Sequence, residues 1–176
     1  MRLRLHVLWV PLFVHQAYGN IAGGDCQHGS RILQCINVVD HLHKQGNPQN
    51  MQAQPHYHNV VAEVSTFLSE RIAAAEAAGI HRERIVIDPG FGFGKTLAHN
   101  LALLCELKKL TELGVPILAG LSRKSMLGTL TGQDITQRLP ASIAAALIAV
   151  QHGAKIVRVH DVRATVDALK VWNAAA

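Results

Sequence analysis

Four ionisable side chains stand at or just after the ends of short apolar runs: Asp88, Lys124, Arg158 and His160. A partly desolvated carboxylate can accept two hydrogen bonds from an aminopyrimidine edge, as it does from a guanidinium. Lysine and arginine can reach a ring carbonyl or an anion, and arginine can also stack on a flat ring. The set therefore predicts a site for a flat, polar ligand that carries a negative charge.

Each of the first two groups also has a purely structural interpretation. Asp88 precedes Pro89 at the end of an apolar run, where an aspartate often caps a helix or tethers a loop. Lys124 lies in the sequence Ser122-Arg123-Lys124-Ser125, which is equally compatible with a solvated basic turn.

Arg158 and His160 are more informative because residues two apart on a strand share a face. An arginine inside a short apolar strand needs a partner, since a buried unpaired charge costs about 3–5 kcal/mol. The partner is either a ligand or an internal acid, and Asp161 and Asp88 are the candidates. Asp161 itself follows the strand directly, so we expect it to cap the last helix.

The loop from Gly90 to Thr96 alternates glycine with phenylalanine and lysine. Glycine allows close approach to a ligand, and Phe93 either walls an aromatic substrate or packs into the core. The loop resembles a phosphate-binding Walker A loop, but Pro89 stands where its first glycine is required. The spacing does not match the dinucleotide-binding pattern either, so the sequence gives no support to nucleotide binding.

The elements that position these residues follow a strand–loop–helix rhythm. The strand ends lie about 35 residues apart, which is typical of βα units with parallel strands in an open sheet or a (β/α)8 barrel. Both folds gather ligand groups at the carboxyl ends of their strands. The pattern predicts strands at 84–88, 115–121 and 155–160, and helices at 59–79, 100–114, 126–130, 140–153 and from 161 through Trp172.

Composition restricts the function classes. The chain has 176 residues, 49% of them hydrophobic, and a formal net charge of +5 without a dense basic block, so no nucleic-acid partner is expected. Three cysteines without CxxC spacing predict neither a disulfide framework nor a zinc site and favour the cytoplasm. The apolar stretch 5–14 is too short to span a membrane, which needs ~20 residues. His41, His43, His56 and His58 have HxH spacing, which is weak evidence for a metal.

The first 43 residues differ from the rest. They contain neither glutamate nor lysine but five of the eleven histidines, and only Ile32–Val39 reads as a short strand. We interpret residues 1–42 as an atypical segment, frameshifted or disordered, and 43–176 as the barrel-like domain. An ordinary variable N-terminal extension is the alternative.

Three motifs in order resemble dihydropteroate synthase of the bacterial folate pathway: Asp88-Pro89-Gly90-Phe91-Gly92-Phe93-Gly94-Lys95, Ser122-Arg123-Lys124-Ser125 and Arg158-Val159-His160-Asp161-Val162. Gln45-Gly46-Asn47-Pro48 with Met51-Gln52 is similar to the loop after that family's fifth strand. The resemblance runs from about His43 to the C-terminus. It implies part of a (β/α)8 barrel containing strands six to eight, with the N-terminal half missing or replaced.

The resemblance also implies a reaction and its residues. It would join 6-hydroxymethyl-7,8-dihydropterin pyrophosphate to p-aminobenzoate, with Mg2+ on the leaving pyrophosphate, and sulfonamides would compete with p-aminobenzoate. Asp88, Lys124 and Arg158 would be catalytic. Pterin, pyrophosphate and p-aminobenzoate would contact Asp88, Gly92, Phe93, Lys95, Ser122, Lys124, Arg158 and His160. The Mg2+ ligand would come from the N-terminal half, and a homodimer is expected.

The resemblance leaves alternatives open. The motifs of the family's strands one to four do not occur here, and a closed barrel needs at least ~200 residues. The chain is then a truncated synthase or a non-catalytic pterin-binding fragment. A corrinoid-linked pterin methyltransferase on the same barrel fits less well, because the basic motifs suit a pyrophosphate leaving group better.

Overall fold

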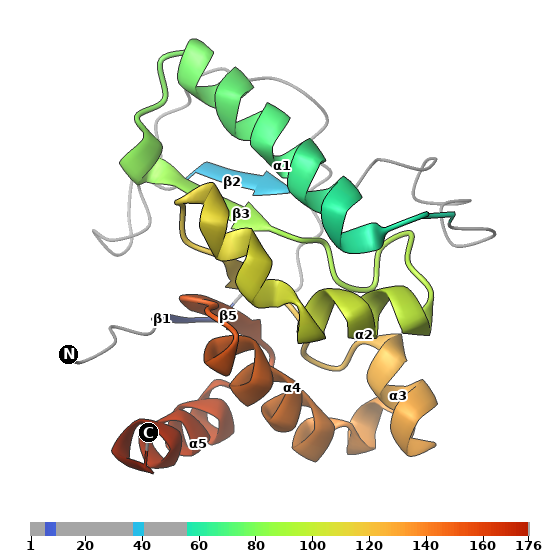
Figure 1. The fold of residues 1–176 in the computed structure, drawn as a ribbon. Helices are drawn as coiled ribbons and strands as arrows, with labels where there is room; N and C mark the ends of the chain where they lie inside the picture. Colours follow the sequence, from blue (N-terminus) through green and yellow to red (C-terminus); the bar gives the residue numbers. More distant parts are fainter. Residues whose placement is uncertain (1–5, 10–36, 41–55, 176) are drawn as a thin grey trace.

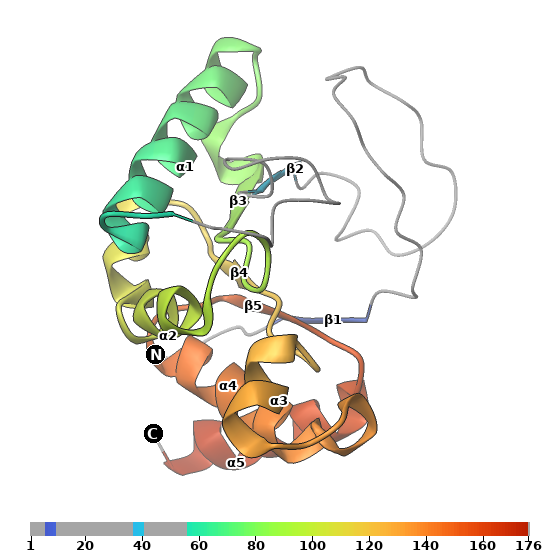
Figure 2. The ribbon, with the colours of Figure 1, turned by 90° about the vertical axis from the view of Figure 1, so that its right-hand side faces the viewer.

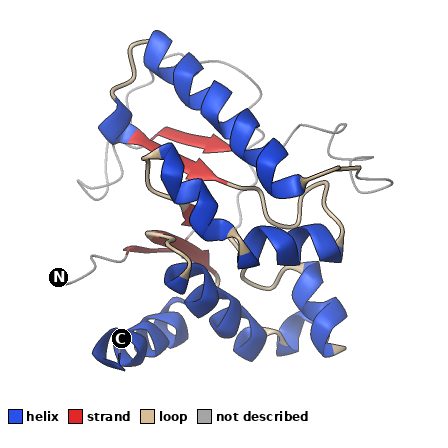
Figure 3. Cartoon of the chain, in the orientation of Figure 1, coloured by secondary structure: helices blue, strands red, loops and turns tan. Residues whose placement is uncertain are grey.

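A computed structural model of the chain describes residues 6–9, 37–40 and 56–175. Strands and helices alternate along most of this length, as Figure 3 shows. The strands are β1 His6–Trp9, β2 Asn37–Asp40, β3 Ile85–Asp88, β4 Leu118–Ala119 and β5 Ile156–Val159. The helices are α1 Val60–Ala77, α2 Leu97–Cys105, α3 Ser125–Thr131, α4 Leu139–Gln151 and α5 Val162–Ala175, with single-turn 3-10 segments η1 Arg82–Arg84 and η3 Ile135–Gln137 and a longer one, η2 Leu107–Leu113.

All described strand pairs are parallel, as the βα rhythm predicts. One sheet has the order β1-β5-β4 and the other pairs β2 with β3. A parallel bridge between Ile87 and Ile117, with the Ile87 N–H donated to the Pro116 carbonyl at 3.0 Å, joins the two. The resulting spatial order is β2-β3-β4-β5-β1, so the carboxyl ends of β3, β4 and β5 are neighbours.

The helices lie along one side of this row of strands (Figures 1 and 2). The α1 residues that follow helical spacing are buried, among them Val64 and Leu68, and they join a core cluster with Ile85, Ile87 and Leu107. Asn59 begins the helix as predicted, because its side chain accepts a hydrogen bond from the Ala62 N–H. A second cluster of Ala146, Val150, Val157, Val159 and Leu169 packs α4 and α5 against β5.

Side chains along each strand point alternately to the two faces of the sheet, so a second set of residues lies on the face away from the helices. Val86, Leu118 and Ile156 form a small buried cluster of their own, separate from the helix-covered core. The residues two positions further along each strand direction are Asp88, Gly120 and Arg158. Because side chains two apart share a face, these three lie in one row above that cluster. The register of the three strands therefore brings Asp88, Gly120 and Arg158 together on one face of the sheet.

Some predicted boundaries are wrong. The second helix begins at Leu97, not at 100, because Thr96 and His99 form a reciprocal capping box. Past Cys105 its chain continues as the 3-10 segment η2. The predicted strand 115–121 is regular only at Leu118–Ala119.

The predicted atypical segment 1–42 contains β1 and β2, which pair with β5 and β3. The rest of that segment lies outside the described residues, as do His41, His43, Cys26, Cys35 and the 45–52 loop motif. The domain boundary at 43 stays a prediction. Within the described part of the chain, no helix has the length and apolar character needed to cross a membrane.

Candidate functional site

The carboxylate of Asp88 lies at the end of β3 and is only 1% exposed. Its Oδ1 accepts a hydrogen bond from the Gly90 N–H at 2.9 Å, so the residue tethers the loop that follows. Its Oδ2 lies 2.9 Å from Nη2 of Arg158 in an ion pair. The contact lacks hydrogen-bond geometry, so Oδ2 accepts no hydrogen bond from the described residues. Asp88 therefore both tethers the loop and serves as the internal partner of Arg158. Its Oδ2 keeps unused acceptor capacity.

Gly120 makes the Asp88–Arg158 pair possible. β4 lies between β3 and β5, so the Arg158 side chain must cross it to reach Asp88. A Cβ built at position 120 would stand 2.6 Å from Nη2 of Arg158 and 3.1 Å from its Cζ. A glycine inside an apolar strand is a signal for close approach of another group, and sequence reasoning missed it here.

The glycine-rich loop after β3 is held by two buried side chains. Lys95 is 5% exposed, and its Nζ donates to the carbonyl oxygens of Gly90 at 2.8 Å and Phe93 at 3.1 Å. Asn100, which is 2% exposed, accepts from the Gly92 N–H at 2.8 Å and donates to the Lys95 carbonyl at 3.2 Å. Lys95 was expected to contact substrate, but these bonds give it a role in holding the loop. The sequence pattern predicts only that a helix begins near Asn100, and does not predict its contact with the loop.

Lys124 lies across this loop. Its Nζ is 3.8 Å from the centroid of the Phe93 ring, a cation–π contact. Gly92 has a φ of +77°, and a Cβ there would stand 2.9 Å from Cδ of Lys124. The two phenylalanines have different roles, since Phe91 is 1% exposed in the core whereas Phe93 stays partly exposed beneath the ammonium.

Ser122 connects the tips of β4 and β5. Its buried Oγ accepts a hydrogen bond from the His160 N–H at 3.2 Å and lies 2.9 Å from Nδ1 of the same residue. The direction of the hydrogen bond between the two side chains depends on the tautomer of the ring, because a hydroxyl oxygen that accepts one N–H can still accept a second. The His160 side chain is exposed and shares its face with Arg158, while Val157 and Val159 are buried, as the strand alternation predicts.

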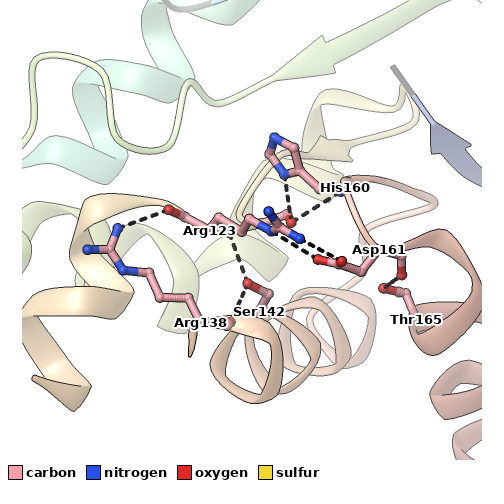
Figure 4. A network of polar contacts seen from close by, with 7 residues as sticks. Arg123, Arg138, Ser142, His160, Asp161 and Thr165 are labelled. Atoms are coloured by element: carbon pink, nitrogen blue, oxygen red, sulfur yellow. Dashed lines mark hydrogen bonds and ion pairs between the residues drawn. The ribbon is translucent and has the colours of Figure 1, made fainter. Parts of the chain in front are cut away.

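Arg123 and Asp161 form a further link between β4 and β5 (Figure 4). Nε and Nη2 of Arg123 donate to the two carboxylate oxygens of Asp161 at 3.1 and 2.7 Å. This side-chain hydrogen bonding, with the charge of Asp161, raises the pKa of Arg123 above its usual value. Asp161 directly precedes α5 as predicted, and its carbonyl oxygen accepts from the Thr165 N–H, but its side chain binds Arg123.

The described residues contain no group of three histidine, cysteine, aspartate or glutamate side chains that could hold a metal ion. The rings of His56 and His58 instead pack edge to face at 5.0 Å. Cys105, the last residue of α2, is exposed and has a free thiol.

Three comparisons with known proteins agree. The sequence profile of the family described as pterin binding enzyme matches residues 33–160. Dihydropteroate synthase from Haemophilus influenzae is 53% identical over 135 residues, which cover 77% of this chain and 49% of that protein. The crystal structure of dihydropteroate synthase from Stenotrophomonas maltophilia with active site-bound imidazole is 60% identical, with a TM-score of 0.75, and covers 78% of this chain and 52% of the other.

A third relative was solved with a ligand. Dihydropteroate synthase from Xanthomonas albilineans in complex with 7,8-dihydropteroate is 55% identical, with a TM-score of 0.72 over 78% of this chain and 49% of that one. The chain thus spans about half the length of the relatives it matches. The profile match begins before residue 43 and includes β2. The first two motifs lie inside the matched range, and the third begins inside it and continues to Val162. The chain therefore belongs to the family of pterin binding enzymes.

Proposed function

We propose that these strand tips form the substrate site of a dihydropteroate synthase. The observation that carries the proposal is that each of the three tips contacts the other two. Asp88 pairs with Arg158, Gly92 packs against Lys124, and Ser122 binds His160. The three contacts bring together one carboxylate and three basic groups. A flat, polar ligand with a negatively charged substituent requires this combination.

Asp88 is proposed to accept the amino edge of the pterin. Its Oδ2 has unused acceptor capacity, and its present neighbour, the guanidinium of Arg158, has the same planar arrangement of N–H donors as that edge. The pterin would take the place of the guanidinium against the carboxylate. Arg158, which is one third exposed, would then stack over the ring.

The basic groups are proposed to act on the leaving group and the second substrate. Arg158 and His160 would hold the pyrophosphate, and Lys124 would donate to the pterin carbonyl. Departure of pyrophosphate leaves a cationic pterin methylene, which the Asp88 carboxylate and ring delocalisation stabilise. The amine of p-aminobenzoate, placed along Phe93, Ser122 and Lys124, then attacks that carbon and afterwards loses a proton. Sulfonamides would compete for the same place.

Magnesium does not fit the described residues. Mg2+ prefers oxygen ligands, and beside Asp88 the predicted site residues present an ammonium, a guanidinium and an imidazole. The oxygen ligand that the resemblance implies would come from the N-terminal half.

For assembly and location, we propose a cytoplasmic homodimer without a nucleic-acid partner. Two exposed apolar side chains, Ile148 on α4 at 40% and Val171 on α5 at 70%, support a contact through these helices. Sedimentation at several protein concentrations tests the dimer.

The test of the function uses the full chain with both substrates. We expect calorimetry to detect binding of the pterin pyrophosphate, and mass spectrometry to detect 7,8-dihydropteroate. Lys124→Ala should weaken binding, whereas Lys170→Ala, on the exposed face of α5, should not. Binding without product would support a non-catalytic pterin-binding protein. Absence of binding would refute the site.

A further inference from the structure

We propose that Arg123 is a positioning residue, whose contacts fix the backbone turn that presents Lys124 over Phe93. The expected effect on substrate affinity rests on the proposed function, whereas the expected effect on the position of Lys124 does not. Arg123 is not among the predicted site residues, and its side chain is directed at Asp161.

The backbone at Arg123 is unusual. Its φ is +57°, and among the residues the structure describes it is the one non-glycine with a positive φ. The Lys124 N–H is hydrogen-bonded to the Leu121 carbonyl at 3.3 Å, so Arg123 is the third residue of a tight turn. Glycine is the usual residue where a turn requires a positive φ at this position. An arginine there persists only if its surroundings determine the conformation.

The surroundings do so from three directions (Figure 4). The Arg123 N–H donates to Ser142 Oγ on α4 at 2.9 Å. Its carbonyl oxygen accepts from Nη1 of Arg138 at 3.1 Å. Its guanidinium binds Asp161 bidentately, which fixes both direction and distance. The two peptide groups that flank residue 123 are thus held by Ser142 and Arg138, and its side chain is held by Asp161 at the end of β5.

The contact from Arg138 depends on a glycine in α3. A Cβ at Gly128 would stand 2.3 Å from Nη2 of Arg138 and 2.5 Å from its Cζ. Gly128 is buried within a helix, where glycine is intrinsically unfavourable. Its place there is explained by the arginine that crosses it. Glycine at position 128 thus leaves room for the Arg138 side chain that binds the Arg123 carbonyl.

The consequence of the turn is the placement of Lys124. Lys124 follows directly and has φ −60° and ψ 150° at the start of α3. From that backbone the stem passes Gly92, and the ammonium reaches the Phe93 ring at 3.8 Å. If residue 123 left its left-handed conformation, the direction of the next side chain would change. The bidentate pair at Asp161 is the contact that substitution can remove without altering Lys124 or Phe93.

The test measures the place of Lys124 directly. Lysines of the full chain are reductively dimethylated with 13C, and Lys124→Arg identifies the Lys124 signal. We expect that signal to be shifted upfield by the Phe93 ring in the wild-type chain. The shift should be lost in Arg123→Ala, which lacks the guanidinium but keeps the Cβ that disfavours a positive φ, and in Asp161→Asn. Arg163→Ala on the exposed part of α5 is the control and should keep it.

Affinity is the second readout. Calorimetry with the pterin pyrophosphate should show binding weakened about tenfold or more in Arg123→Ala, since Lys124 would lose a charge-assisted hydrogen bond to the pterin. The urea midpoint of the same variant shows whether it is folded; if it is not, Asp161→Asn takes its place. An unchanged Lys124 signal in a folded variant overturns the inference. If the wild-type chain binds no pterin pyrophosphate, the proposed function fails, while the signal still decides the role of Arg123.

Discussion

The pair between Asp88 and Arg158 allows a quantitative test of how the site is held together. At the observed 2.9 Å, two unit charges interact by about 6 kcal/mol at an effective dielectric constant of about 20, and by about 1.4 kcal/mol in water. Asp88 is buried, whereas the Arg158 side chain is one third exposed, so the pair lies between these limits. We expect a coupling free energy of about 2–4 kcal/mol.

A double-mutant cycle measures this coupling. Asp88→Asn, Arg158→Gln and the double variant are unfolded in urea, with circular dichroism as the signal. Arg158→Gln leaves a buried carboxylate without its counter-charge, so it should destabilise the chain by several kcal/mol, about 3 at the low end. The double variant should be less destabilised than the two single variants added together, because it contains no unpaired charge.

The matched control is the exposed pair of Arg82 and Glu76, whose side chains are 47% and 39% exposed and lie 3.1 Å apart. Solvent screening predicts about 0.2–1 kcal/mol for this pair. The distances of the two pairs are similar, so burial is the main difference between them. A coupling for Asp88 and Arg158 no larger than that of the control would refute the electrostatic reasoning.

Three further outcomes follow from the structure. Gly120→Ala should displace the guanidinium above it and reduce the Asp88 coupling to near zero in the same cycle, at a cost of about 1–3 kcal/mol. Burial, with the charge of Glu63 second, raises the pKa of Tyr57, so absorbance titration should find its phenolate forming above pH ~10, and stability should fall as pH rises through that range. Leu68→Ala should cost about 2–5 kcal/mol in urea unfolding, whereas Leu130→Ala, at a residue that is 52% exposed, should change the free energy of unfolding by no more than about 0.5 kcal/mol.

Sequence reasoning predicted the parallel strands, because apolar runs and strand alternation are local properties. For Arg158 it left the partner open between a ligand and an internal acid, Asp161 or Asp88, and the structure shows the pair with Asp88. It missed the contact of Asn100 with the loop and the two carbonyl partners of Lys95. Where a lysine ammonium points depends on the path of a loop with positive φ at Gly90, Gly92 and Gly94, which no periodicity encodes. The partner of Asp161 was missed for a similar reason, since it comes from a residue 38 positions away.

The glycines of the site have a common physical role. A glycine-rich loop is usually explained by close approach to a ligand, but here three glycines make room for the chain's own cations. The pairs are Gly92 with Lys124, Gly120 with Arg158 and Gly128 with Arg138, and in each a Cβ would come within 2.3–2.9 Å of the long side chain. Each cation is thereby held against protein atoms before any guest arrives, and groups fixed in advance need less reorganisation when charge develops. Glycine is therefore required at these positions by the path of the basic side chains as much as by the shape of a substrate.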